Sequence, residues 1–106
     1  MTGNAFKAGF LNINLLRGHI EPFRKFFSDN PNYHLFGVAE SWLGPSVDDS
    51  LVRIDGFSLI RNDRNVSGSG VALYVRSDFR VTRLAFSETT GSDKPGVPEY
   101  LFCAVQ

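Results

Sequence analysis

Two polar side chains each follow an apolar run that is typical of a buried strand. Asn12 lies in the sequence Leu-Asn-Ile-Asn at residues 11–14, and Glu40 lies in the sequence Val-Ala-Glu-Ser-Trp-Leu at residues 38–43. In open α/β sheets, ligands bind beyond the carboxyl ends of the strands, so we expect Asn12 and Glu40 to face one crevice. A metal-dependent phosphodiesterase needs such a pair.

The apolar periodicity predicts a βαβ unit that brings these two residues together. The stretch 6–13 predicts a first strand that becomes buried on both faces. Residues 18–29 predict a helix, because apolar side chains repeat at helical spacing, Glu21-Pro22 suits the first turn and Asn30-Pro31 ends it. The run 35–39 predicts a second strand, parallel to the first across the helix.

The later part of the chain predicts mostly antiparallel strands. After Gly44-Pro45-Ser46, residues 47–52 predict a brief helical turn and residues 54–60 predict extended structure. Residues 57–75 predict a hairpin with a long charged tip. Further strands are expected at 80–86 and 100–105, joined by a turn-rich surface loop at 87–98.

Composition indicates one small globular domain with no overall attraction to nucleic acid. The chain has 106 residues, of which 42% are hydrophobic and 13% aromatic, enough for a single core. Lys plus Arg and Asp plus Glu number 11 each, so any DNA contact must be local. Cys103 is the only cysteine, which excludes an intramolecular disulfide, and its apolar surroundings indicate a buried structural thiol.

The sequence shows no signal for secretion or membrane insertion. The amino terminus lacks a basic segment followed by a long apolar core, and no apolar stretch approaches the roughly 20 residues of a membrane span. We therefore expect an intracellular chain, nuclear or cytoplasmic, with no membrane partner. On this interpretation the glycosylation pattern at Asn65-Val66-Ser67 is a chance match.

The order of the short motifs resembles the endonuclease/exonuclease/phosphatase superfamily, and within it the apurinic-type endonuclease domain of non-LTR retrotransposons. After the two strand ends come Asp55-Gly56-Phe57, Arg61-Asn62-Asp63-Arg64 and the run Gly-Ser-Gly-Val-Ala-Leu-Tyr-Val at 68–75. The resemblance implies an α/β fold that is the amino-terminal half of a four-layered sandwich. Residues 1–106 would then form one partial, truncated domain.

The resemblance also implies roles for individual residues in Mg²⁺-dependent (or Mn²⁺-dependent) nicking of DNA. Glu40 would bind the metal ion, and Asn12 would hydrogen-bond the metal shell or the scissile phosphate. Arg17 and Arg64 would hold phosphates through forked hydrogen bonds. The alternatives are a Glu40 that only caps its loop and arginines that are merely solvated, while Trp42 is interpreted as packing the loop.

Several catalytic motifs of the family are missing from the chain. The family's general base is a histidine after Ser-Asp, but neither His19 nor His34 follows such a pair. The tyrosine that the family has in the middle of the domain is also missing. The family's Asp-x-Asn motif is missing as well, because Asp63-Arg64-Asn65 has the right spacing but lies in the hairpin tip. The resemblance therefore covers roughly the first half of the domain, by the order of these motifs.

Two main hypotheses of different classes follow. The chain is a fragment of a Mg²⁺-dependent DNA endonuclease, inactive alone, or it is a catalytically dead protein- or nucleic-acid-binding module derived from that domain. A third possibility is another branch that acts on phosphoinositides or RNA, because fold does not settle substrate. Half of such a fold would expose an apolar sheet face, so we expect self-association or pairing with the missing carboxyl-terminal half.

Overall fold

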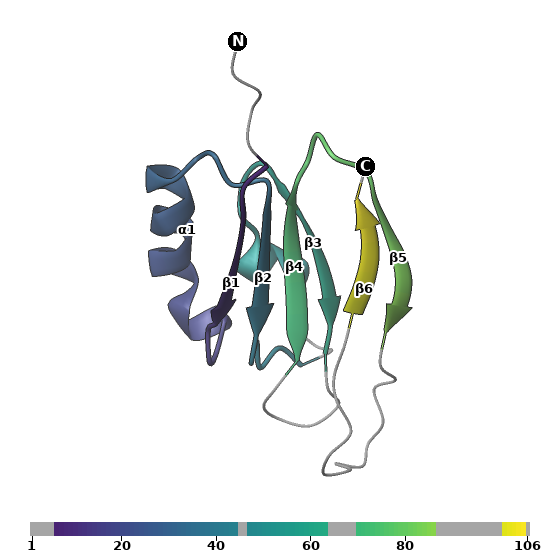
Figure 1. Ribbon diagram of the computed structural model, residues 1–106. Coiled ribbons are helices and arrows are strands. Elements are labelled where there is room, and N and C mark those ends of the chain that lie inside the picture. The colour runs from purple at the N-terminus through teal and green to yellow at the C-terminus, as the bar shows by residue number, and fades with distance from the viewer. Residues whose placement is uncertain (1–5, 45–46, 64–69, 87–100, 106) are drawn as a thin grey trace.

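The fold begins with the βαβ unit that the periodicity predicts (Figure 1). A computed structural model describes residues 6–44, 47–63, 70–86 and 101–105. Strand β1 (Ala8–Asn12) leads through the 3-10 turn η1 (Arg17–His19) into helix α1 (Ile20–Asp29), and β2 (Leu35–Ala39) returns parallel to β1. The helix ends where the Asn30 side chain donates to the Phe26 carbonyl, 2.9 Å away, immediately before Pro31.

The remaining strands are antiparallel, as the sequence predicts. The 3-10 turn η2 (Asp49–Val52) precedes β3 (Phe57–Asn62), and β4 (Val71–Arg76) inserts between β2 and β3 to give a four-stranded sheet of order β1-β2-β4-β3. Strands β5 (Val81–Phe86) and β6 (Leu101–Val105) pair in a separate two-stranded sheet. The fold is therefore mixed α/β.

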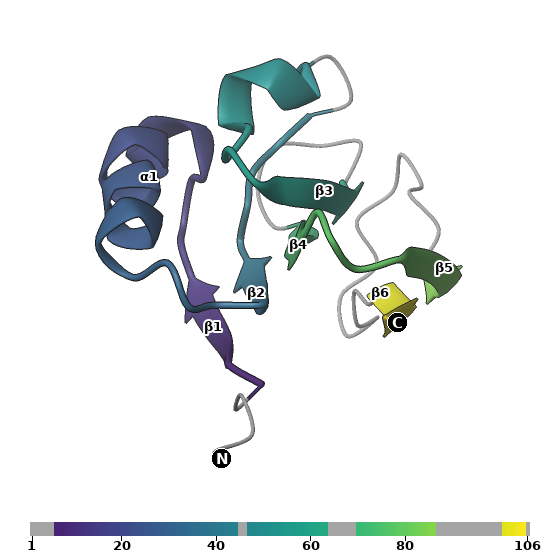
Figure 2. The same ribbon diagram turned by 90° about the horizontal axis from the view of Figure 1, so that it is seen from above.

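An aromatic core fills the space between α1 and the four-stranded sheet, and Figure 2 shows α1 and η2 on the same side of that sheet. The Phe27 ring centroid lies 5.3 Å from that of Phe36 on β2 and 4.8 Å from that of Phe57 on β3. Tyr74 on β4 is fully buried, and its hydroxyl donates to the Val52 carbonyl over 2.6 Å. The core thus joins α1, three strands and η2 into one unit.

The sequence predicts a first strand buried on both faces, and this prediction is wrong. Strand β1 lies at the edge of the sheet, where Phe10 is 70% exposed and Leu11 is 42% exposed. The helix packs its rings on β2, β4 and β3, and a cavity of about 480 Å³ separates part of α1 from β1. An apolar run predicts a strand, but it does not show whether other elements bury both faces of that strand.

Where β1 and β2 pair, each strand places a glycine opposite a phenylalanine of the other strand. Gly9 pairs with Phe36, and Phe10 pairs with Gly37. A Cβ atom added to Gly9 would lie 2.5 Å from the Phe36 ring, and one added to Gly37 would lie 3.3 Å from the Phe10 ring. Each ring therefore occupies the space that the opposite glycine leaves empty.

Smaller differences concern where elements begin. The predicted helix starts as η1 and becomes α-helical at Ile20, and the strand predicted from residue 54 begins at Phe57, after a turn in which Gly56 has φ +86°. The hairpin tip is predicted at 61–69, but its first two residues belong to β3, and residues 64–69 and the loop at 87–98 lie outside the described residues. Within the described part of the chain, no helix is both long and apolar enough to cross a membrane.

Candidate functional site

The parallel strands β1 and β2 bring Asn12 and Glu40 to the same edge of the sheet, where both arrowheads point in Figure 1. Asn12 pairs with Ala39, the residue before Glu40. The ladder continues into the loops, since the Ile13 amide donates to the Ala39 carbonyl over 3.0 Å. Gly9 faces the Phe36 ring, which packs on Phe23 of α1. Because side chains alternate along a strand, Phe10 and Asn12 lie on the opposite sheet face, away from α1.

The loops after these strands have left-handed backbone at residues that are not glycine. Among the described residues this conformation occurs at Asn14 (φ 46°), Leu15 (φ 87°), Glu40 (φ 55°) and Trp42 (φ 57°). Such conformations cost on the order of 1–3 kcal/mol each and persist only where the surroundings enforce them. Strain that gathers at two adjoining strand ends is a common property of functional sites.

Backbone hydrogen bonds enforce this geometry from both sides of Ser41. The Leu15 amide donates to the Glu40 carbonyl over 2.9 Å, and the Leu16 amide donates to the Ser41 carbonyl over 2.9 Å. The Ser41 amide in turn donates to the Gly70 carbonyl over 3.1 Å. The loop after β2 is therefore held between the loop after β1 and the start of β4.

Ser41 is the buried centre of this loop. Its side chain is 0% exposed, and its hydroxyl has no hydrogen-bond partner among the described residues. A Cβ atom added to Gly70, where φ is +91°, would lie 2.7 Å from the Ser41 hydroxyl oxygen. Gly70 therefore combines a backbone conformation that favours glycine with a position that has no room for a side chain, while Gly68 and Ser69 lie outside the described residues.

Trp42 makes a contact that the sequence did not reveal. Its indole N–H donates to Oε2 of Glu40 over 3.1 Å, and the Trp42 side chain is 44% exposed. The sequence assigned Trp42 to packing of the loop. The available signal was the presence of the sole tryptophan two residues after the candidate acid.

Arg61 on β3 holds the segment that follows the candidate site. Its guanidinium donates to the carbonyls of Gly44, at 3.0 Å, and Val47, at 2.7 Å. It also pairs with Asp49 and with Asp63, each at 2.7 Å. Burial by itself lowers the pKa of Arg61, but the hydrogen bonds and charges of Asp63 and Asp49 outweigh it and the pKa is raised.

The other site residues considered from the sequence are placed differently. Arg17 is exposed in η1, shortly after the loop that follows β1, whereas Arg64 lies outside the described residues. His19 contacts the Leu15 carbonyl through Nδ1 at 2.9 Å. His34 precedes β2 at the opposite end of the sheet, where its Nδ1 accepts from the Lys7 amide over 2.9 Å.

The side chains at this edge fit a hydrated magnesium ion rather than a metal enclosed by protein ligands. Among the described residues, no group of three or more His, Cys, Asp or Glu side chains could hold a metal. Glu40 offers a carboxylate and Asn12 an amide oxygen at the same edge. Mg²⁺ commonly binds through one or two carboxylates while keeping several waters and taking a substrate phosphate.

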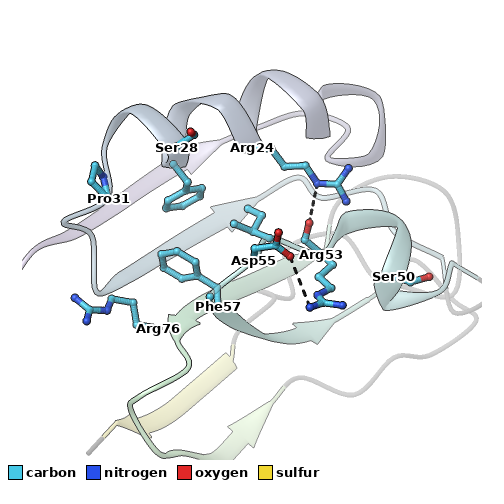
Figure 3. Close-up of a pocket in the computed structure, with 11 residues that line it drawn as sticks. Arg24, Ser28, Pro31, Ser50, Arg53, Asp55, Phe57 and Arg76 are labelled. Carbon is cyan, nitrogen blue, oxygen red and sulfur yellow. Dashed lines mark hydrogen bonds and ion pairs between the residues drawn. The ribbon is translucent and has the colours of Figure 1, made fainter.

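A separate groove of about 800 Å³ runs between α1 and the segment from η2 to β3 (Figure 3). Arg24, Arg53 and Arg76 line it. Each of these arginines pairs with a carboxylate, at 2.6, 3.6 and 3.0 Å respectively, and the guanidinium groups do not converge on one point in Figure 3. Because Pro31 and Arg76 border the groove, it reaches the end of the sheet opposite Glu40.

Comparison with known proteins identifies the fold. The sequence matches no family model and no curated protein. The structure is similar to the crystal structure of the AP endonuclease LMAP from Leishmania major, with a TM-score of 0.62 and 21% identity over 74% of this chain. The match spans 28% of the length of that protein. The chain therefore folds like one part of that AP endonuclease.

Proposed function

We propose that this chain is an amino-terminal part of a DNA endonuclease of the non-LTR retrotransposon type, which nicks its target site with Mg²⁺ or Mn²⁺. The observation that carries the proposal is the placement of Asn12 and Glu40 at the carboxyl ends of two neighbouring parallel strands. The similarity to an AP endonuclease supports DNA as the substrate. The order of the hairpin motifs supports the retrotransposon branch, and a DNA substrate implies action in the nucleus or cytoplasm.

The residues at the strand ends suggest a division of labour. Glu40 holds the metal ion, which when bound supplies positive charge next to the scissile phosphate. The Asn12 amide can donate to a phosphate oxygen and thereby fix the orientation of the phosphodiester. Arg17, exposed nearby in η1, supplies a phosphate contact that positions the DNA strand without reading its sequence.

Neither histidine of the given sequence follows a Ser-Asp pair, so this proposal takes the general base from a partner. We propose that a carboxyl-terminal half supplies it and packs on the sheet face opposite α1. Phe10, 70% exposed on that face, is the observation that favours such a partner. Self-association of the chain through the same face is the competing arrangement.

Nicking of supercoiled plasmid in Mg²⁺ by the 106-residue chain, alone and after mixing with a candidate carboxyl-terminal half, tests the proposal. We expect nicking only in the mixture, and we expect Glu40→Gln to abolish it. Asp55→Asn is the matched control, because the Asp55 side chain is 97% exposed and lies in the separate groove. Nicking by Glu40→Gln at the rate of the unmodified chain would overturn the assignment of the site.

A binding module without catalysis is the second candidate, and the missing Ser-Asp-His motif favours it. It predicts that the folded mixture binds duplex DNA without nicking it. The substrate class is tested by the same preparation, offered RNA and phosphoinositide vesicles. Faster turnover of either one than of DNA would replace the DNA assignment.

A further inference from the structure

The loop after β2 presents two side chains outward around one buried residue. Glu40 and Trp42 both have left-handed backbone, with φ values of 55° and 57°, and Ser41 between them is 0% exposed. Backbone bonds from Leu16 and to Gly70 hold Ser41 in place. The strain at positions 40 and 42 therefore sets where these two side chains lie relative to each other.

The contact between them is a hydrogen bond to one carboxylate oxygen. The Trp42 indole N–H donates to Oε2 of Glu40 over 3.1 Å, and within the described residues this is the hydrogen bond that Glu40 makes through its side chain. An indole nitrogen only donates and carries no charge. It can therefore orient the carboxylate without becoming a metal ligand and without repelling a cation.

A packing role alone does not account for this arrangement. The Trp42 side chain is 44% exposed, whereas the core residues of the α1 interface are less than one-tenth exposed. Neighbours that hydrogen-bond a ligating side chain fix its orientation, and their loss typically lowers metal affinity roughly 10–100-fold. The bond to Oε2 leaves Oε1 of Glu40 as the oxygen that is available to a cation.

We propose that Trp42 is a positioning residue for Glu40, which holds Oε2 through its indole N–H so that Oε1 is presented to a divalent cation. This inference rests on the proposed function, because it takes Glu40 to be the metal ligand. It goes further by assigning separate tasks to the two carboxylate oxygens. It also gives the strained loop the role of placing the Trp42 indole next to Glu40.

Binding of Mn²⁺ to the 106-residue chain, followed by electron paramagnetic resonance of the free ion, tests the inference without any activity assay. Trp42→Phe keeps an aromatic ring and removes the N–H, so we expect it to weaken Mn²⁺ binding about tenfold. Glu40→Gln should abolish binding at this site. Asp55→Asn, in the separate groove, should bind as the unmodified chain does.

The outcomes separate the two proposals. Unchanged binding by Glu40→Gln would overturn the metal site itself. Loss of binding in Glu40→Gln with unchanged binding in Trp42→Phe would overturn the positioning role alone. Equal thermal unfolding of Trp42→Phe and the unmodified chain by circular dichroism would show that weaker binding is not a folding defect.

The unmodified chain offers a second readout if Trp42→Phe does not fold. Trp42 is the only tryptophan, so all tryptophan fluorescence reports on this loop. A Mn²⁺ ion held by Glu40 should quench that fluorescence, with the same midpoint as the resonance titration and with no saturable quenching in Glu40→Gln. Saturable Mn²⁺ binding that leaves the fluorescence unchanged would overturn the inference.

Discussion

The α1 interface and the loops at the ends of β1 and β2 differ in how they are stabilised. The interface is apolar and made of rings in ordinary edge-to-face contact, such as Phe23 against Phe36 at 5.4 Å. The loops contain left-handed backbone at Glu40 and Trp42 and a buried hydroxyl at Ser41 with no partner among the described residues. The interface therefore stabilises the fold, and this stability offsets the cost of the strained loops that hold two polar side chains in place.

Removal of an interface ring tests the stabilising region most directly. Phe27 is 5% exposed and contacts rings from both α1 and the sheet. We expect Phe27→Ala to lower the free energy of unfolding by about 3–5 kcal/mol, measured by urea denaturation, because it deletes buried surface and leaves a cavity. A loss below about 1 kcal/mol would show that the interface is loosely packed.

A methyl group at Gly70 tests how tightly the strained region is held. It would meet the Ser41 hydroxyl at 2.7 Å and force a side chain into a backbone with φ +91°. We expect Gly70→Ala to destabilise the chain by roughly 1–3 kcal/mol and to weaken Mn²⁺ binding as well. Gly44→Ala is the control, since its added Cβ meets nothing within 4 Å, and equal losses in the two variants would argue against a tight loop.

Tyr74 connects the interface to η2 and makes the stability depend on pH. Burial raises the pKa of the Tyr74 phenol, so the folded chain keeps a proton that the unfolded chain releases above about pH 10. Its contribution to stability is therefore complete below that pH and is lost as the pH rises further. Between about pH 8 and pH 11, the midpoint temperature of thermal unfolding should therefore fall less steeply with pH for Tyr74→Phe than for the unmodified chain.

The same variant loses the hydrogen bond to the Val52 carbonyl at neutral pH. We expect a cost of about 0.5–1.5 kcal/mol in the free energy of unfolding, measured by urea denaturation. Tyr33→Phe is the matched control, because Tyr33 is only partly buried at the margin of the core. A pH profile that is identical for Tyr74→Phe and the unmodified chain would contradict the role of the buried phenol.

The smallest effect on stability is expected at the candidate ligand. Glu40→Gln keeps the shape of the side chain at a partly exposed position, so the free energy of unfolding should change by less than about 0.5 kcal/mol. Binding of Mn²⁺ should nevertheless be lost. A large change in stability would show that Glu40 supports the loop rather than a ligand.

The elements of the first region could be predicted because their signals are local. Helix α1 follows from apolar residues at helical spacing and from Asn30-Pro31, and β2 follows from a short apolar run. The exposure of β1 could not be predicted in this way. Whether an apolar strand is central or at an edge depends on segments far away in the sequence.

In the second region, the placement of the two candidate residues at one end of the sheet was predictable, but the geometry of the loops was not. Asn12 and Glu40 could be brought together because parallel strands end at one edge of a sheet. The bond between Trp42 and Glu40 depends on left-handed backbone that tertiary hydrogen bonds impose, and no local pattern signals it. The contacts of Arg61 with the carbonyl groups of Val47 and Gly44 could not be predicted for the same reason, since these residues lie 14 and 17 positions away in the sequence.

The two glycine–phenylalanine pairs between β1 and β2 also determine how Asn12 is positioned along the sheet relative to Glu40. A shift of one residue would move Asn12 by about 3.3 Å along the strand and turn its side chain to the opposite sheet face. The same shift would break both matched pairs, Gly9 with Phe36 and Phe10 with Gly37. The two glycines thus fix the register of β1 against β2, and this register determines the position of Asn12 relative to Glu40.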